Sequence, residues 1–288
     1  MPRTIVVTDS ASSLTKEEQE TYGIVVLPML FYVDGTEYRE GISISKETLF
    51  EALREEKQVS TTQIPLGELL ETWQKLLETY DELVYIPLSG EISGGYETGV
   101  LLSRQFDGKV TVIDSRSVSL IEGAVAIEAA KLAQKGYSGS QIKEKLAEVI
   151  PENIIYVTVD SLKQLKKGGR VSGAAAWTGD LLQIKPVLRI LDGPVEMYRK
   201  AHGVHKAKKV IMEEIHKAWE LLSEKYGANR LKLYMAYGDN ADAAEKWKAE
   251  MQQEFPDHPI TMRSLPLNLC CHLGPGTIGA GISICLEN

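Results

Sequence analysis

The loop at residues 87–96, Pro-Leu-Ser-Gly-Glu-Ile-Ser-Gly-Gly-Tyr, combines residue types that can bind an anion. It follows residues 83–88, whose apolar character predicts a buried strand, and it leads into residues 96–103, which predict a helix. The first amides of a helix lack internal partners, and the helix dipole places about half a positive charge there. Gly94 lets a ligand approach the backbone, and Ser93 adds a hydroxyl donor. The loop therefore predicts an anion site, although it lacks the lysine of a P-loop.

Other polar side chains have both a structural and a ligand-binding interpretation. Thr61 and Thr62 precede an apolar segment from about Leu66 that predicts a helix, so they are candidate N-caps as well as candidate ligand donors. Ser93 has the same two interpretations at the helix after its loop. His272, ahead of Gly-Pro-Gly, either orders a turn or donates to a ligand, and its protonated form would hold an anion more firmly.

Composition narrows the class of protein. The 288 residues are 43% hydrophobic and carry a net charge of −8, which argues against nucleic-acid binding as the main task. The three cysteines are odd in number and two are adjacent, so no disulfide framework is implied and a cytoplasmic location is expected. No apolar run approaches the ~18 residues of a membrane span, so no transmembrane segment is expected.

Several catalytic and metal chemistries lack their motifs. His202 and His205 have helical spacing and residues 270–272 read Cys-Cys-His, but structural zinc sites use cysteines separated by about two to four residues. The chain has no Gly-x-Ser-x-Gly motif and no dinucleotide-binding glycine motif after its first strand. We therefore expect no metal and no cofactor.

The order of predicted elements indicates an α/β protein with two domains. In residues 1–150, short apolar strands alternate with amphipathic helices, which is typical of a Rossmann-like domain with a parallel sheet. The strands are predicted at residues 4–8, 24–28, 83–88 and 110–113, and the helices at 46–56, 66–80, 95–106 and 118–135. Asp9 and Asp114 follow two of these strands, and we interpret them mainly as turn residues at a polar rim.

Residues 151–288 have a different pattern. A strand at 154–159 is followed by a basic loop at 163–170, and Asp192-Gly193 predicts the turn of a β-hairpin. A long helix at 204–226 precedes further strands and a helix. This half predicts an α+β domain with a mixed or antiparallel sheet.

Seven short blocks, taken together and in order, resemble motifs of the DegV family, whose members include bacterial fatty-acid-binding proteins. The second block, Ser-Thr-Thr-Gln-Ile-Pro, is similar to the family's Thr-Ser-Gln-Pro-Ser motif, and the last resembles its His-x-Gly-Pro-Gly block. The blocks are residues 5–14, 60–65, 88–96, 112–115, 165–172, 184–188 and 272–279.

The resemblance implies that one long-chain fatty acid, such as palmitate, stearate or oleate, lies buried between two α/β domains. It implies a non-catalytic carrier that presents the lipid to a separate fatty acid kinase, which makes an acyl-phosphate for phospholipid synthesis. The residues assigned to the carboxylate on this basis are Thr61, Thr62, Ser93, Gly94 and His272.

Two further residues are candidates for contact with a phosphate or the partner. Arg170 follows two glycines and is either such a contact or part of a solvated basic loop. His202 stands where the family often carries an arginine for the kinase or the phosphate. Gly90 and Gly95 also depart from the family pattern, and the first departure removes one hydroxyl donor.

The chemistry of a fatty acid agrees with this assignment. Burial of about 14 methylenes at ~0.8 kcal/mol each gives a gross gain near ~11 kcal/mol, but the carboxylate still needs hydrogen bonds because an unpaired buried charge is costly. The alternative is an enzyme or kinase subunit that acts on a small phosphorylated or carboxylated substrate, by analogy with dihydroxyacetone kinases. A carrier predicts an aliphatic tunnel, whereas an enzyme predicts a polar cleft with a positioned base of shifted pKa.

Overall fold

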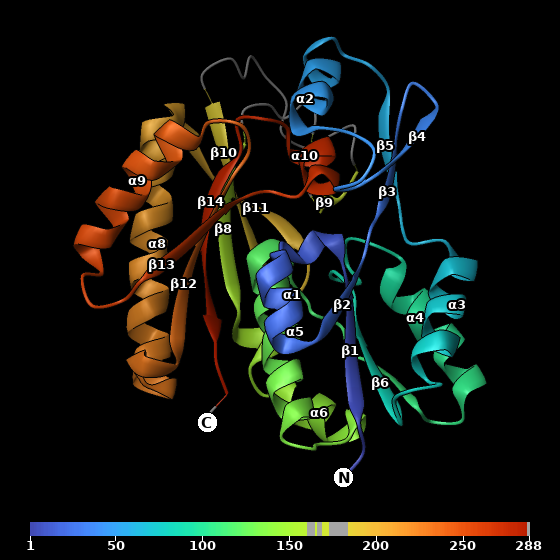
Figure 1. Ribbon diagram of the computed structural model, residues 1–288. Coiled ribbons are helices and arrows are strands. Elements are labelled where there is room, and N and C mark those ends of the chain that lie inside the picture. The colour runs from blue at the N-terminus through green and yellow to red at the C-terminus, as the bar shows by residue number, and fades with distance from the viewer. Residues whose placement is uncertain (160–164, 166–168, 173–183, 287–288) are drawn as a thin grey trace.

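The computed structural model describes residues 1–159, 165, 169–172 and 184–286 (Figure 1). Most of the predicted basic loop, residues 163, 164 and 166–168, lies outside the described residues. In the described part of the chain, two large sheets stand on either side of a central helix, and a small third sheet lies at one end (Figure 1).

The first sheet is parallel, as the sequence predicts, with strand order β2-β1-β6-β7. Its strands are β1 Thr4–Asp9, β2 Ile24–Leu27, β6 Glu82–Ile86 and β7 Val110–Val112. They are apolar on both faces because both faces are covered. The helices around them are α1 Lys16–Tyr22, α3 Leu66–Leu76, α4 Gly95–Ser103, α5 Ser119–Gln134 and α6 Gly139–Leu146.

The second sheet is mixed, with strand order β13-β12-β14-β8-β10-β11-β9, so the expected α+β character of this half is confirmed. Its strands are β8 Ile154–Thr158, β9 Val171–Ser172, β10 Ile184–Leu191, β11 Val195–His202, β12 Leu231–Tyr237, β13 Ile260–Ser264 and β14 Ile278–Ile284. The predicted hairpin joins β10 to β11, and Asp192 and Gly193 both have positive φ. Helices α8 Gly203–Tyr226 and α9 Ala241–Glu254 cover the outer face (Figure 1).

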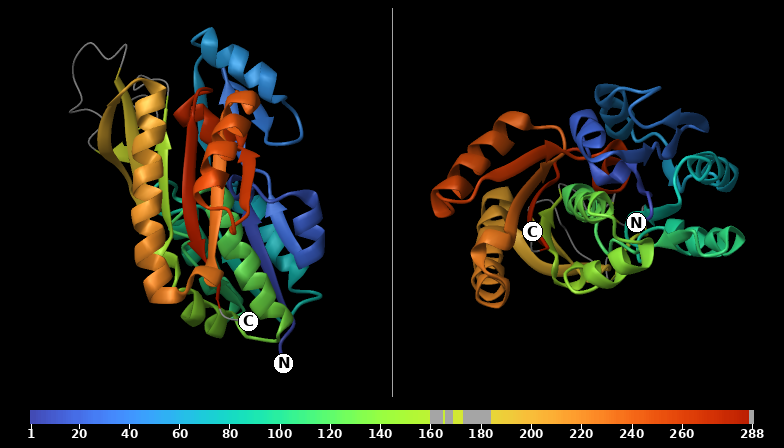
Figure 2. Two further views of the ribbon diagram at one scale, coloured as in Figure 1. Left: turned by 90° about the vertical axis from the view of Figure 1, so that its left-hand side faces the viewer. Right: turned by 60° about the horizontal axis from the view of Figure 1, so that its bottom comes forward.

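Helix α5 lies between the two large sheets (Figure 2). It contacts β1 in the first sheet and both β12 and β14 in the second. Its sequence, Ser-Leu-Ile-Glu-Gly-Ala-Val-Ala-Ile-Glu-Ala-Ala-Lys-Leu-Ala-Gln, has small or apolar residues around most of its circumference, as is typical of a helix buried on all sides. Each hydrophobic core cluster contains residues from both halves of the chain. The two halves therefore share their cores across residue 150.

The small third sheet was not predicted. It is antiparallel, with order β4-β3-β5, and its strands are β3 Leu30–Val33, β4 Thr36–Arg39 and β5 Val59–Thr62. Asp34-Gly35, with positive φ at both residues, forms the two-residue turn between β3 and β4. Thr61 and Thr62 belong to β5, so their interpretation as N-caps is wrong. Pro65 precedes α3, and no side chain of the described residues caps this helix.

Two short helices complete the end of the molecule that carries the third sheet. They are α2 Lys46–Arg54 and α10 Leu267–Leu273. Helix α10 comes from the second half of the chain and packs against α2 and β5 of the first half. No helix among the described residues is long and apolar enough to cross a membrane.

Candidate functional site

A polar pocket of about 740 Å³ lies where the loop after β6, strand β5 and helix α10 meet. All five residues assigned to a carboxylate line it, together with the predicted phosphate or partner contact Arg170. These residues are Thr61, Thr62, Ser93, Gly94, Arg170 and His272. The fold thus brings together side chains from separate segments of the sequence.

Thr61 and His272 form the central contact of this pocket. The distance from Thr61 Oγ1 to His272 Nε2 is 2.7 Å, and either atom can donate, depending on the tautomer of the imidazole. Burial lowers the pKa of His272 to about 4, and the positive charge of Arg170 acts in the same direction. The imidazole is therefore neutral at pH 7 without a ligand. This differs from the protonated histidine considered from the sequence, because the imidazole is removed from solvent beside a guanidinium.

The loop before α4 presents a hydroxyl and a helix N-terminus to the same pocket. Ser93 Oγ accepts a hydrogen bond from the Gly95 amide at 3.3 Å, and its own proton can be donated to a ligand. Gly94 is the N-cap residue of α4 and has no side chain to cap the helix. A Cβ at Gly94 would lie 3.1 Å from Gln63 Oε1, so glycine keeps this approach open.

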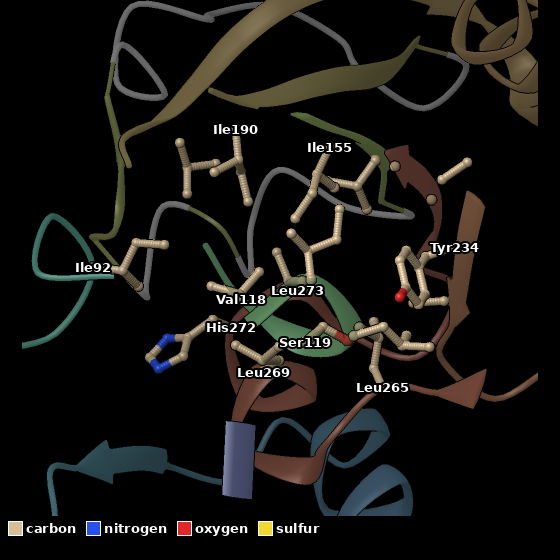
Figure 3. Close-up of a pocket in the computed structure, with 18 of the residues that line it drawn as sticks. Ile92, Val118, Ser119, Ile155, Ile190, Tyr234, Leu265, Leu269, His272 and Leu273 are labelled. Carbon is tan, nitrogen blue, oxygen red and sulfur yellow. The ribbon is translucent and has the colours of Figure 1, made fainter. Parts of the chain in front are cut away.

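An apolar cavity of about 850 Å³ adjoins the polar pocket. The apolar cavity and the polar pocket share four lining residues, Ile92, Arg170, Leu269 and His272. Figure 3 shows His272 at one end of the cavity and Tyr234 at the other.

The walls of the apolar cavity come from two layers of the fold. One face of the second sheet contributes Ile155, Val157, Ile190 and Val195, and the first turn of α5 contributes aliphatic side chains opposite them. Ser119 is one of the few polar residues on these walls, and its hydroxyl lies 3.0 Å from Ser13 Oγ, so it has a partner. The cavity is suited to a hydrocarbon chain.

Glycines on β14 are cavity residues that the sequence analysis missed. Gly279 and Gly281 both line the cavity and alternate along the strand. A Cβ at Gly281 would lie 2.7 Å from Ile121 Cδ1 and 2.6 Å from the carbonyl oxygen of Ile154. Glycine here allows α5 to lie close against the sheet. The signal was present in the sequence, since glycine inside a strand often marks such a close approach.

Two carboxyl groups, the buried Asp9 and the half-buried Glu40, hold the segments that form the polar pocket. Asp9 accepts from the amides of Ala11 at 2.9 Å and Leu88 at 3.0 Å, and so ties the end of β1 to the loop after β6. Glu40 accepts from Ser10 Oγ at 2.8 Å and from the amide of Leu267 at the start of α10. These roles agree with the structural interpretation of Asp9.

Burial governs the ionisation of these groups. It raises the pKa of Glu40 to about 7, against the hydrogen bonds that favour the charged form. Burial and then the charge of Asp9 raise the pKa of Glu122 well above its usual range. Asp9, Glu40 and Glu122 line neither the polar pocket nor the apolar cavity.

Of the two residues predicted to contact a phosphate or a partner, Arg170 and His202, only the first lies at the site. Arg170 lines both the polar pocket and the apolar cavity, whereas His202 is exposed at the end of β11 and lines neither. Asp114 accepts from the Gly90 amide at 3.1 Å and so has a structural role. The described part of the chain contains no group of three or more His, Cys, Asp or Glu side chains that could hold a metal ion.

These features define a class of α/β protein with an apolar cavity between two sheets and a polar pocket at one end of it. The sequence model of the family described as "Uncharacterised protein, DegV family" matches residues 3–284. A DegV domain-containing protein of Deinococcus radiodurans is 31% identical over 282 residues, which cover 96% of this chain and 97% of the relative. The chain belongs to the DegV family.

Solved structures of the family have the same fold. A DegV family protein of Thermus thermophilus, described with fatty acid binding, has a TM-score of 0.86 and 29% identity, covering 98% of this chain and 99% of its own. DegV of Bacillus subtilis, described as a fatty acid binding protein, has a TM-score of 0.84 and 27% identity, covering 99% of this chain and 100% of its own.

Proposed function

We propose that this protein is a carrier that binds one long-chain fatty acid, such as palmitate, stearate or oleate. The acyl chain occupies the apolar cavity and the carboxylate occupies the polar pocket. The observation that carries this proposal is the junction of the two at His272, because a fatty acid needs a long apolar volume that ends in hydrogen-bond donors. The fatty acid binding described for the Thermus and Bacillus relatives supports it.

The contact between Thr61 and His272 assigns a direction to the hydrogen bonds around the carboxylate. A threonine hydroxyl has one proton, and a carboxylate only accepts. For Thr61 to donate to the ligand, His272 must donate from Nε2 to Thr61 Oγ1 across the 2.7 Å contact. We therefore assign the Nε2–H tautomer to the bound state. Ser93 and the amides at the start of α4 supply further donors.

The positions of Arg170 and His202 suggest how the carrier meets a kinase. Arg170 is exposed and also lines the polar pocket, so we assign it to the acyl-phosphate that a fatty acid kinase would form on the bound lipid. His202, exposed and away from the pocket, is assigned to contact with the kinase itself. This proposal implies a cytoplasmic location, where ATP is available to the kinase.

An enzymatic function draws on the same pair of residues. A histidine hydrogen-bonded to a threonine hydroxyl has the geometry of a general base beside a nucleophile. A base works best when its pKa lies near the working pH, and the pKa of His272 is lowered to about 4. This mismatch and the aliphatic cavity favour the carrier.

Native mass spectrometry of the purified protein tests the proposal, followed by solvent extraction and gas chromatography of the ligand. We expect a bound mass near that of a C16 to C18 fatty acid. If the purified protein carries no lipid and does not bind added palmitate or oleate, the carrier function is wrong. Turnover of a small phosphorylated or carboxylated substrate would establish the enzymatic alternative.

A further inference from the structure

A third cavity of about 720 Å³ lies beyond the end of the apolar cavity that is opposite His272. It reaches the surface, because the exposed residues Lys232 and Thr261 line it. Of the described residues, Leu120 and Tyr234 are the two that line both this outer cavity and the apolar cavity. They are therefore the partition between the two spaces.

The fold places Tyr234 where its ring has a large effect on the length of the cavity. Tyr234 lies on β12 and is paired with Gly281 of β14 and Thr261 of β13. Because Gly281 has no side chain, the ring stands beside bare backbone on the cavity side. Leu120 approaches from the first turn of α5, and Figure 3 shows the Tyr234 ring at the far end from His272.

The two sides of this partition differ in chemistry. The outer cavity is lined by the ion pair between Glu18 and Arg263, with an N···O distance of 2.6 Å, and by the pair between Glu128 and Lys131, at 2.7 Å. Hydrocarbon gains no hydrophobic stabilisation among hydrated charges. The terminal methyl of a bound chain therefore belongs on the apolar side.

We propose that Tyr234, together with Leu120, is the end wall that sets the longest acyl chain this protein binds well. The inference rests on the proposed fatty-acid function and deepens it. Up to the wall, each added methylene is buried and strengthens binding by about fourfold. Beyond the wall, a longer chain must fold back or displace the ring, so affinity stops rising and falls.

The test measures the affinity of saturated fatty acids from C12 to C22, by displacement of a fluorescent fatty acid. For the unaltered protein we expect a rise with length and then a break. In Tyr234→Ala the acyl chain can extend into the space that the ring filled on the apolar side, so the break moves to longer chains. The first chain beyond the original break should gain about tenfold in affinity relative to the unaltered protein.

Three further variants distinguish an effect of the end wall on chain length from a general effect of substitution on binding. Tyr234→Phe keeps the ring and should keep the break at the same length. Leu273→Ala enlarges the cavity near His272 and should weaken all chains without moving the break. Leu120→Ala shortens the other residue of the wall, so it should also move the break to longer chains. This variant keeps the test decisive if Tyr234→Ala does not fold.

The outcomes distinguish this inference from the function on which it rests. If the unaltered protein binds no fatty acid of any length, the carrier itself is wrong. If it binds fatty acids but the break stays at the same length in the folded wall variants, the end-wall assignment is overturned and the carrier stands.

Discussion

At the scale of the residue, hydroxyl groups are the part of the proposed site that can be tested most directly. Thr61→Val removes the hydroxyl but keeps the branched shape, so the carboxylate loses one donor. Hydrogen bonds to charged groups contribute about 1.5–3 kcal/mol, and we expect fatty-acid affinity to fall by about 10- to 150-fold. Calorimetric titration with oleate measures the change.

Two variants on the same strand control this prediction. Thr61→Ser keeps the hydroxyl and should retain affinity within about threefold, since the hydrogen bond survives. Ser60→Ala changes an exposed residue next to the site and should have no effect on binding. Equal affinities for Thr61→Val and Thr61→Ser would show that the threonine hydroxyl does not hold the ligand.

The pKa of His272 has a consequence for stability at low pH. The imidazole has a pKa of about 4 in the folded protein and about 6.5 when unfolded, so the unfolded chain binds more protons between these values. The contribution of neutral His272 is present above pH 6.5 and is lost as pH falls toward 4. We expect His272→Gln to lose less stability than the unaltered protein between pH 7 and 5 in urea unfolding. A parallel pH dependence in the two proteins would contradict the assignment.

At the scale of the element, Glu40 controls how α10 is held. Its pKa is raised to about 7 from 4.5, so the folded protein binds more protons between these values, and its contribution is present below pH 4.5 and lost as pH rises through 7. This is opposite in sign to His272 over nearly the same window. In Glu40→Gln only the histidine effect of the two remains, and we expect a larger loss of stability between pH 7 and 5.

The environment of Glu40 makes this variant a fair test. Asn268 donates to Glu40, and Asn268 Oδ1 has no hydrogen-bond partner among the described residues. A flipped Asn268 amide can accept from the amide that Glu40→Gln introduces, so the substitution need not leave a clash of donors. Urea unfolding at the two pH values measures the difference. An unchanged pH slope would show that Glu40 does not titrate in this window.

Prediction from the sequence succeeded where apolar runs, helical periodicity or turn residues gave a local signal, and it failed for the third sheet. Helix α8 and the hairpin at Asp192-Gly193 were predicted because amphipathic periodicity and turn residues are local signals. The sheet of β3, β4 and β5 was missed because β4 and β5 are short and mostly polar, which leaves β3 without a recognisable partner in the sequence. Asp34-Gly35 is a strong hairpin signal that was overlooked.

The residues of the polar pocket were predicted, but their arrangement was not. Family motifs and hydroxyl-rich loops indicated Thr61 and His272 separately, and these residues are 211 positions apart. Only the packing of α10 against β5 brings them to 2.7 Å, and no local pattern encodes that contact. The wall at Tyr234 has the same origin, because it depends on how α5 lies across the second sheet.

At the scale of the whole molecule, the two halves of the chain share their hydrophobic cores, and this affects whether the predicted domains, divided at residue 150, can fold separately. Both core clusters contain side chains from each half, and α5 is covered by strands of both large sheets. Residues 1–150 alone would expose the apolar face of α5 that packs on β12 and β14. We expect this fragment not to fold, by circular dichroism and by amide dispersion in NMR spectra. A stable, well-dispersed fragment would instead show that residues 1–150 form an independent domain.

Ligand binding should stabilise the molecule as one unit. A ligand that binds only the folded state adds about 2.7 kcal/mol at a concentration of 100 times Kd. We expect oleate to raise the melting temperature of the unaltered protein, and to raise it less in Thr61→Val. Coincident transitions by fluorescence and circular dichroism would show that both sheets melt together.

The position of β14 has a further consequence for biosynthesis. This strand pairs with β12 on one side and β8 on the other, although it follows every other described strand in the sequence. While the ribosome is still making the preceding residues, the second sheet has a gap at its centre and its strand edges are unpaired. Unpaired strand edges of this kind are prone to aggregation, and a nascent chain in this state lacks the β14 wall of the apolar cavity. Because β14 also lines the apolar cavity, the proposed fatty-acid site is complete only after this last strand has been made.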